Sequence, residues 1–319
     1  MQILIFGKDG QLGKAFSNLF ASLALPKTTQ IHFVGREQCD LSDGDALLAL
    51  LEQSHANLII NASAYTAVDK AQSEAELAFS INAVAPELMA HYAAKHGATF
   101  LHYSTDYVFD GEKCGFYLED DRRHPLSVYG KSKAAGEEAI TRVFDSVGAG
   151  QYAIFRTSWV YGDGGNFIRT ILRLAKERDQ LRVIDDQYGV PTSAEWLARI
   201  SLRLALNAAG QLNTFPSGIY HAVPAGETSW HGLAQYAVRA AIAAGVPLKI
   251  TPELIQGIPA VEYPLPAPRP MNSRMGTQKL QAILASSSSY NGAEVSPGFP
   301  AWEPMVGEYI CQLASDGCI

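Results

Sequence analysis

The chain has 319 residues, 47% of them hydrophobic, with a formal net charge of −7 and a pI near 5.6. This length allows two domains or one large α/β domain with a sizeable core. The acidic balance and the lack of a basic stripe argue against a nucleic-acid partner. No apolar run of 18 residues predicts a membrane span.

The cysteines indicate a reducing environment. Cys39, Cys114, Cys311 and Cys318 show no close metal-type pairing, and the last two are seven residues apart, which is not a zinc spacing. We interpret them as free thiols. The N-terminal run lacks a basic n-region and a signal cleavage pattern, so we expect a cytoplasmic protein.

A glycine loop follows the first predicted strand, residues 2–6. It reads Gly7-Lys-Asp-Gly10-Gln-Leu-Gly13 and leads into a helix-like segment, 14–23. Strand, glycine loop and helix form the context of a dinucleotide-binding loop, although the first gap is one residue longer than in the commonest fingerprint. The alternative is a tight turn without a ligand. The position directly after an apolar strand favours binding.

The second predicted strand, residues 30–36, ends in Arg36, and Asp40 and Leu41 follow shortly. The adenosine ribose is recognised at the end of this strand in dinucleotide-binding folds. A carboxylate there favours a free 2′-hydroxyl, whereas an arginine accepts a 2′-phosphate. Arg36 therefore slightly favours NADPH over NADH as the cofactor. The alternative is a solvated loop arginine.

The β-α alternation continues through three more strands, at 57–64, 99–105 and 152–158, with helices at about 73–96 and 127–144. This pattern predicts a Rossmann-type, doubly wound parallel sheet that binds its ligand at the carboxyl ends of the strands. Asn82 lies among apolar residues of the first helix and must find partners. It ties the helix to the strand end near Ser104 or satisfies a backbone group of the core.

Tyr129 and Lys133 are four residues apart, so a helix places them on one face. A nearby ammonium favours the phenolate, which predicts a lowered pKa for Tyr129 and a role as an acid or base near neutral pH. Ser104 and Thr105 end the neighbouring strand and can offer hydroxyls to the same oxygen. Such a set can protonate a carbonyl oxygen while hydride reaches its carbon. Taken alone, the pair is weak evidence, because it also suits an ordinary helix surface.

The second half of the chain has a looser pattern. We expect helices at 166–179, 193–208 and 228–244, a strand with a turn at 181–192, and a last strand at 218–223. Five prolines between residues 259 and 270 exclude a central strand or helix there. We expect a dinucleotide-binding domain at 1–160, to which 183–225 returns, and a smaller, interleaved substrate lobe at 161–182 and 226–319.

Seven motifs in order resemble the extended short-chain dehydrogenase/reductases, and within them the dTDP-4-dehydrorhamnose reductase family. They are the glycine loop, Asn61-Ala-Ser-Ala-Tyr-Thr-Ala-Val-Asp69, Ser104-Thr-Asp-Tyr-Val-Phe-Asp-Gly111, Tyr129-Gly-Lys-Ser-Lys133, Arg156-Thr-Ser-Trp-Val-Tyr-Gly162, Asp186-Gln-Tyr-Gly-Val-Pro-Thr192 and Arg269-Pro-Met-Asn-Ser273. The resemblance implies NAD(P)H-dependent reduction of the 4-keto group of dTDP-4-dehydro-L-rhamnose to dTDP-L-rhamnose.

The resemblance also implies roles for individual residues. Tyr129 would donate the proton, Lys133 would hold the nicotinamide ribose and lower the pKa of Tyr129, and Thr105 would supply the hydroxyl, with Ser104 beside it. The other cofactor contacts would be Gly7, Gly10, Gln11, Leu12 and Gly13 at the pyrophosphate, Asp40 and Leu41 at the adenine, and Ala62, Ala64 and Tyr65 along the cofactor.

The substrate contacts implied by the resemblance fall into two groups. Asp106, Tyr107 and Trp159 would line the sugar pocket, and Arg269, Asn272 and Ser273 would hold the nucleotide end, where an arginine suits phosphate oxygens. The alternatives are core packing for Trp159 and a surface ion pair for Arg269.

Two other functions remain open. A nucleotide-sugar epimerase of the same superfamily would share the Tyr and Lys, and the regulatory subunit of methionine adenosyltransferase resembles the family without catalysing this reaction. The intact Ser/Thr, Tyr and Lys set favours catalysis.

The resemblance also bears on assembly, because some members of the family join subunits through Mg²⁺ held by glutamates. One glutamate lies two residues after the third glycine, where this chain has Ala15, although Glu195 and Glu303 remain as candidates for the other positions. We therefore expect no metal site and a monomer or weak homodimer.

Overall fold

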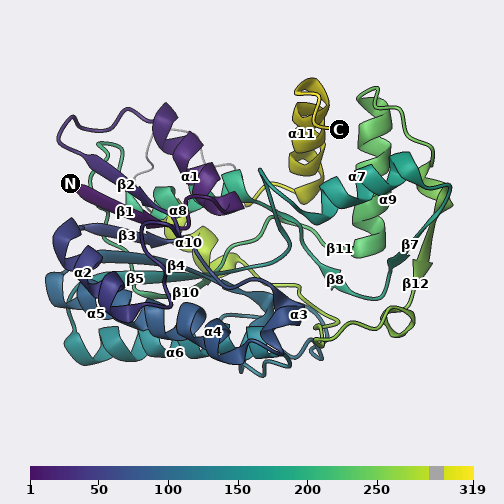
Figure 1. Cartoon of the computed structure of the whole chain (residues 1–319). Helices are drawn as coiled ribbons and strands as arrows, with labels where there is room; N and C mark the ends of the chain where they lie inside the picture. The colour runs from purple at the N-terminus through teal and green to yellow at the C-terminus, as the bar shows by residue number, and fades with distance from the viewer. Residues whose placement is uncertain (287–297) are drawn as a thin grey trace.

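The computed structural model describes residues 1–286 and 298–319. Its centre is a sheet of six parallel strands in the order β10-β5-β4-β3-β1-β2 (Figure 1). The strands are β1 (Gln2–Phe6), β2 (Gln30–Val34), β3 (Leu58–Asn61), β4 (Thr99–Thr105), β5 (Gln151–Thr157) and β10 (Gly218–His221). The predicted Rossmann-type sheet is confirmed. The direction of winding reverses between β1 and β3, and ligands bind at such switch points.

Helices cover both faces of the sheet, which is why its central strands are apolar on both sides. One face packs against α1 (Gln11–Ser22), α8 (Ala194–Ala205) and α10 (Gln278–Ser286). The other packs against α2 (Gly44–Ser54), α5 (Ala85–His96) and α6 (Val128–Val147). In the part of the chain described above, no helix is long and apolar enough to cross a membrane.

A smaller lobe lies beside the sheet and has its own apolar core (Figure 1). Its helices are α7 (Phe167–Glu177), α9 (Trp230–Ala243) and α11 (Trp302–Ser315). Three two-stranded sheets complete it: β7 (Leu181–Ile184) with β12 (Ile255–Ile258), β8 (Tyr188–Gly189) with β11 (Thr228–Ser229), and β6 (Val160–Tyr161) with β9 (Thr192–Ser193). Three short 3-10 helices are η2 (Asp106–Val108), η3 (Pro252–Leu254) and η4 (Ala260–Glu262) in the described residues.

The division between the sheet and the lobe differs in detail from the expected boundaries. β7 pairs with β12 in the lobe, so the chain returns to the sheet with α8 rather than at residue 183. α10 also lies on the sheet, where Leu280 and Leu284 are buried. The strand 218–223 is not the last one, because β11 and β12 follow it; two to four residues carry too little periodicity to be recognised. Of the expected lobe, residues 287–297 lie outside the described part.

The helix expected at 73–96 is interrupted. A short helix α3 (Val68–Ala71) precedes α4 (Ala75–Phe79), and a π-helical turn η1 (Ser80–Val84) joins α4 to α5. Pro86 explains the turn, because its ring has no N–H for the carbonyl of Asn82 and would clash with it. That carbonyl instead faces α6, where a Cβ on Gly136 would lie 2.1 Å from it.

The Asn82 side chain satisfies backbone groups, as the second of the two expected alternatives has it. Its Oδ1 accepts from the Tyr65 N–H at 2.9 Å, and its Nδ2 donates to the Tyr65 carbonyl and to Ser132 Oγ, both at 3.0 Å. The alternative that it reaches the strand end near Ser104 is wrong. Asn82 fixes the loop after β3 against α6.

Candidate active site

Two adjoining cavities lie at the carboxyl ends of β1, β3 and β4. The larger, about 560 Å³, brings together most of the predicted site: Gly7, Gly10, Gln11, Leu12, Ala62, Ala64, Ser104, Thr105, Asp106, Tyr107, Tyr129, Lys133 and Trp159. The smaller, about 330 Å³, contains Arg36, Asp40, Leu41 and Tyr65, and shares Gly7, Gly10 and Ala64 with the larger one. One continuous site thus joins the glycine loop to the Tyr129 hydroxyl.

The glycine loop is shaped for a close backbone approach. Gly7 has a φ of +88°, and a Cβ there would lie 2.8 Å from the Ala62 backbone. A Cβ on Gly13 would lie 2.0 Å from the Gly7 carbonyl, so Gly13 allows α1 to pack on the loop. α1 begins at Gln11 rather than at residue 14, and its N-cap Gly10 offers no side-chain cap. The helix N-terminus therefore presents amides suited to a diphosphate, which fits a dinucleotide.

The adenosine end of the site carries less net positive charge than Arg36 alone would give it. Arg36 lies just beyond β2 and is exposed, and its Nε donates to Asp40 Oδ2 at 3.2 Å. The pKa of Asp40 is lowered, first by the Ser42 backbone N–H and then by other contacts that include Arg36. A cation and an anion thus occupy the place where a 2′-phosphate would be recognised.

A chain of hydroxyls and a carboxylate leads to Tyr129. Thr105 Oγ1 donates to Asp106 Oδ1 at 2.9 Å, and Ser273 Oγ donates to Asp106 Oδ2. Thr105 also contacts the Tyr129 hydroxyl. Thr105 Oγ1 also accepts from the Tyr107 N–H at 3.2 Å, so the hydroxyl is held between Asp106, Tyr107 and Tyr129. Burial raises the pKa of Asp106 to about 6.

The predicted lowering of the Tyr129 pKa is wrong. Burial raises this pKa, and the charge of Asp106 adds to the effect, while the hydrogen bond to Thr105 opposes it. Lys133 Nζ lies 3.1 Å from His102 Nε2, on the side of β4. Tyr129 is therefore a neutral phenol at physiological pH, which is the form that donates a proton.

Lys133 is itself perturbed. It is 1% exposed, and burial lowers its pKa to about 8, although Glu137 opposes this shift. A lysine with such a pKa changes its charge just above neutrality.

Two stacked tryptophans form another wall of the larger cavity. The ring centroids of Trp159 and Trp230 are 3.7 Å apart, and Trp159 has a φ of +47°. Non-glycine residues rarely adopt this conformation, and such strain clusters at binding sites. A Cβ on Gly189 would lie 2.7 Å from the Trp159 ring, so a glycine is needed there.

Sequence reasoning missed several lining residues, namely Ser63, Thr66, Val68, Tyr103, Thr157, Ser158, Val160, Leu197 and Trp230. Trp230 starts α9, about 100 positions after Tyr129, and no spacing rule relates the two. Thr157 follows the buried run of β5 and could have been found as a polar strand end. Over the residues that the structure describes, the buried hydroxyls of Ser104 and Thr157 have no hydrogen-bond partner. Both can bind a ligand in the cavity.

The predicted nucleotide-end residues do not line either cavity. Arg269 makes a bidentate ion pair with Asp69, at 2.7 and 2.8 Å. Asn272 Nδ2 donates to the Lys113 and Gly115 carbonyls, both at 2.7 Å. Ser273 contacts Asp106. These three residues thus hold the segment 269–273 against the dinucleotide-binding domain, next to Asp106.

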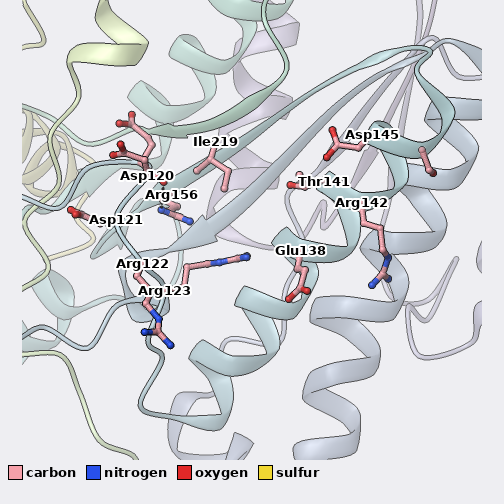
Figure 2. Close-up of a pocket in the computed structure, with 12 residues that line it drawn as sticks. Asp120, Asp121, Arg122, Arg123, Glu138, Thr141, Arg142, Asp145, Arg156 and Ile219 are labelled. Atoms are coloured by element: carbon pink, nitrogen blue, oxygen red, sulfur yellow. Dashed lines mark hydrogen bonds between the residues drawn. The ribbon is translucent and has the colours of Figure 1, made fainter.

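A separate cavity of about 910 Å³ lies between α6, the loop 119–123 and the edge strand β10 (Figure 2). Its labelled side chains carry both signs of charge, among them Arg122, Arg142, Glu138 and Asp145. It shares no lining residue with the cavity at Tyr129. The chemistry described above therefore belongs to the Tyr129 cavity alone.

Comparisons with known proteins agree on one family. The family model described as "RmlD substrate binding domain" matches residues 1–293. The dTDP-4-dehydrorhamnose reductase of Escherichia coli strain K12 is 42% identical over 290 residues, which cover 89% of this chain and 92% of that protein. A dTDP-4-dehydrorhamnose reductase from Clostridium acetobutylicum is similar in structure, with a TM-score of 0.82, 31% identity, and coverage of 98% of this chain and 99% of that one.

One further structure bears on the cofactor. The dTDP-4-dehydrorhamnose reductase of Bacillus anthracis, solved in complex with NADP, has a TM-score of 0.81 and 29% identity, and the match covers 98% of this chain and 100% of that one.

Proposed function

Because this chain belongs to the dTDP-4-dehydrorhamnose reductase family, we propose that it reduces the 4-keto group of dTDP-4-dehydro-L-rhamnose to give dTDP-L-rhamnose. The observation that carries the proposal is the convergence of Tyr129, Thr105 and Lys133 with the glycine loop in one cavity. The cofactor is NADPH or NADH, and the relative solved with NADP supports this choice.

The nicotinamide, when bound, supplies hydride to C4 of the sugar. Tyr129 then donates its proton to the carbonyl oxygen, so that the ketone becomes an alcohol and the tyrosine a phenolate. Thr105 Oγ1, itself a donor to Asp106, orients the Tyr129 hydroxyl. With the coenzyme bound, Lys133 would hold the nicotinamide ribose, and its charge would favour the phenolate until solvent returns the proton.

The sugar lies, in this proposal, between Tyr107, Trp159 and Asp106. Trp159 and Trp230 give an apolar wall and exclude water, while the hydroxyls of Ser104 and Thr157 bind polar groups. The ring of Tyr107 stands edge-on to Tyr129, with centroids 5.4 Å apart, and limits how the substrate can approach. Asp106 accepts from substrate hydroxyls when it is charged.

A spectrophotometric assay with a dTDP-4-keto sugar separates this proposal from its alternatives. The reductase consumes NADPH or NADH in an amount equal to the product. An epimerase of the superfamily interconverts sugars without net consumption. A regulatory subunit like that of methionine adenosyltransferase does neither.

Coenzyme choice tests the role of Arg36. We expect NADPH to be used at least as well as NADH, and Arg36→Ala to lower the NADPH/NADH ratio of kcat/KM by up to about fivefold, because an exposed charge pair contributes at most about 1 kcal/mol. The matched variant Asp40→Asn removes the opposing carboxylate and should raise the ratio. If neither substitution changes the NADPH/NADH ratio of kcat/KM, this ion pair does not recognise the 2′-phosphate.

We also propose that assembly and activity do not depend on a divalent metal, and that the protein is a monomer or a weak homodimer in the cytoplasm. Ala15 on α1 provides no oxygen ligand, and Glu195 forms an ion pair with Arg199 at 2.7 Å. Mass measurement in solution with and without excess EDTA, beside the activity assay, should give the same result in both conditions. A stable dimer that dissociates with EDTA would contradict this.

A further inference from the structure

A row of buried polar side chains runs behind the cavity from Lys133 through His102 to Asn61. Lys133 Nζ lies 3.1 Å from His102 Nε2, and His102 Nδ1 lies 3.1 Å from Asn61 Nδ2. Asn61 and His102 are register partners on β3 and β4, and both are fully buried. Because Asn61 and His102 are fully buried, their polar atoms must find hydrogen-bond partners within the protein.

The orientation of the Asn61 amide determines where His102 carries its proton. Asn61 Oδ1 accepts from the Ser63 N–H at 3.2 Å and from Ser63 Oγ at 2.5 Å. A backbone N–H can only donate, so the amide oxygen faces Ser63 and Nδ2 faces His102. Nδ2 also only donates. His102 Nδ1 is therefore the acceptor, and the neutral imidazole carries its proton on Nε2.

His102 is neutral because burial, with the charge of Lys133 as a second cause, lowers its pKa well below the usual value. The Nε2–H thus points at Lys133 Nζ. A neutral amine accepts this hydrogen bond, whereas an ammonium has only donors and would oppose it. The row as it stands favours the neutral form of Lys133.

Other groups near Lys133 also bear on whether its amine is charged. On α6, Glu137 favours the charged lysine, and the neutral phenol of Tyr129 lies one turn before it. Glu137 is held by Arg156 on β5 and by Arg123, which share its charge. The neighbouring Ser132 binds Asn82 of the π-turn at 3.0 Å, and neither side chain carries a charge. Apart from burial, the His102 donor is the contact in this set that opposes the charge.

We propose that His102, oriented by Asn61, is a positioning residue that holds Lys133 at the boundary between its charged and neutral forms. This rests on the proposed reductase function, in which Lys133 acts as a cation. The lowered pKa of Lys133, about 8, agrees with this. Since the charged form is the active one, kcat/KM should fall as the pH rises through this value.

Two substitutions should raise the pH at which kcat/KM falls, which we call the alkaline limit. In Asn61→Asp the carboxylate only accepts, so it draws the imidazole proton to Nδ1 and leaves Nε2 free to accept from the ammonium. We expect a shift of about one pH unit or more. His102→Gln can turn its side-chain oxygen to Lys133 and should act in the same direction. Asn207→Asp is the matched control, because its exposed Oδ1 already accepts from Ala209 and Gln211 N–H groups, and the limit should not change.

The imidazole tautomer gives a readout that does not depend on turnover. Nitrogen-15 NMR of the coenzyme-free protein, with labelled histidine, should show His102 as the Nε2–H tautomer above about pH 8 and as the Nδ1–H tautomer in Asn61→Asp. An Nδ1–H tautomer in the alkaline wild-type protein would overturn the proposal. An alkaline limit unmoved in both variants would do so as well. Failure of the reductase proposal is distinguishable, because the keto sugar would not be turned over while the tautomer stayed as expected.

Discussion

Replacing Tyr129 with phenylalanine should lower kcat by about 10² or more while leaving coenzyme binding intact. The change removes the oxygen that we propose as the proton donor, and it keeps the ring that packs edge-on against Tyr107. The measurement pairs steady-state kinetics with direct titration of NADPH. Since the phenol serves the transition state, KM should change less than kcat.

Tyr152→Phe is the matched control. This hydroxyl contacts Thr141 at 3.4 Å on the α6 side of the sheet and lies outside both coenzyme cavities. Its removal should leave kcat near the wild-type value. A Tyr129→Phe enzyme with near-normal kcat would remove Tyr129 from the mechanism.

Replacing Glu137 with alanine should destabilise the protein by about 3–5 kcal/mol. Glu137 is 0% exposed and Arg156 1%, and two hydrogen bonds join them, at 2.9 and 2.7 Å. The alanine variant leaves the guanidinium of Arg156 buried without its carboxylate. Urea unfolding, followed by circular dichroism, gives the change in the free energy of unfolding.

Glu177→Ala provides the comparison for an exposed pair. Glu177 pairs with Arg173 at 2.9 Å on α7, and both side chains are more than half exposed. Its loss should cost at most about 1 kcal/mol. Equal losses of unfolding free energy in the two variants would show that burial does not determine how much the Glu137–Arg156 pair stabilises the protein.

The parts of the fold that could be predicted carry local signals. The run at Gln2–Phe6, the glycines after it and the spacing of Tyr129 and Lys133 each combine a short pattern with a known geometry. The order of these segments then predicted the parallel sheet and the cavity at its edge.

What could not be predicted depends on partners that are distant in the sequence. Tyr129 and Lys133 share a helix face, yet the pKa of Tyr129 depends on its burial, and the lysine turns to His102. Arg269 carries a charge suited to phosphate, but Asp69, 200 positions away, binds it. The π-turn before Pro86 and the packing of Trp230 on Trp159 also arise only when distant segments meet.

The central claim is that hydride and proton are added across the 4-keto group in this cavity. The most direct measurement is turnover of dTDP-4-dehydro-L-rhamnose with NADPH deuterated at the transferred position, followed by NMR of the product. We expect one coenzyme oxidised per sugar, with deuterium at C4 of dTDP-L-rhamnose and none elsewhere. Conversion of the sugar without coenzyme oxidation, or a product without deuterium at C4, would contradict it.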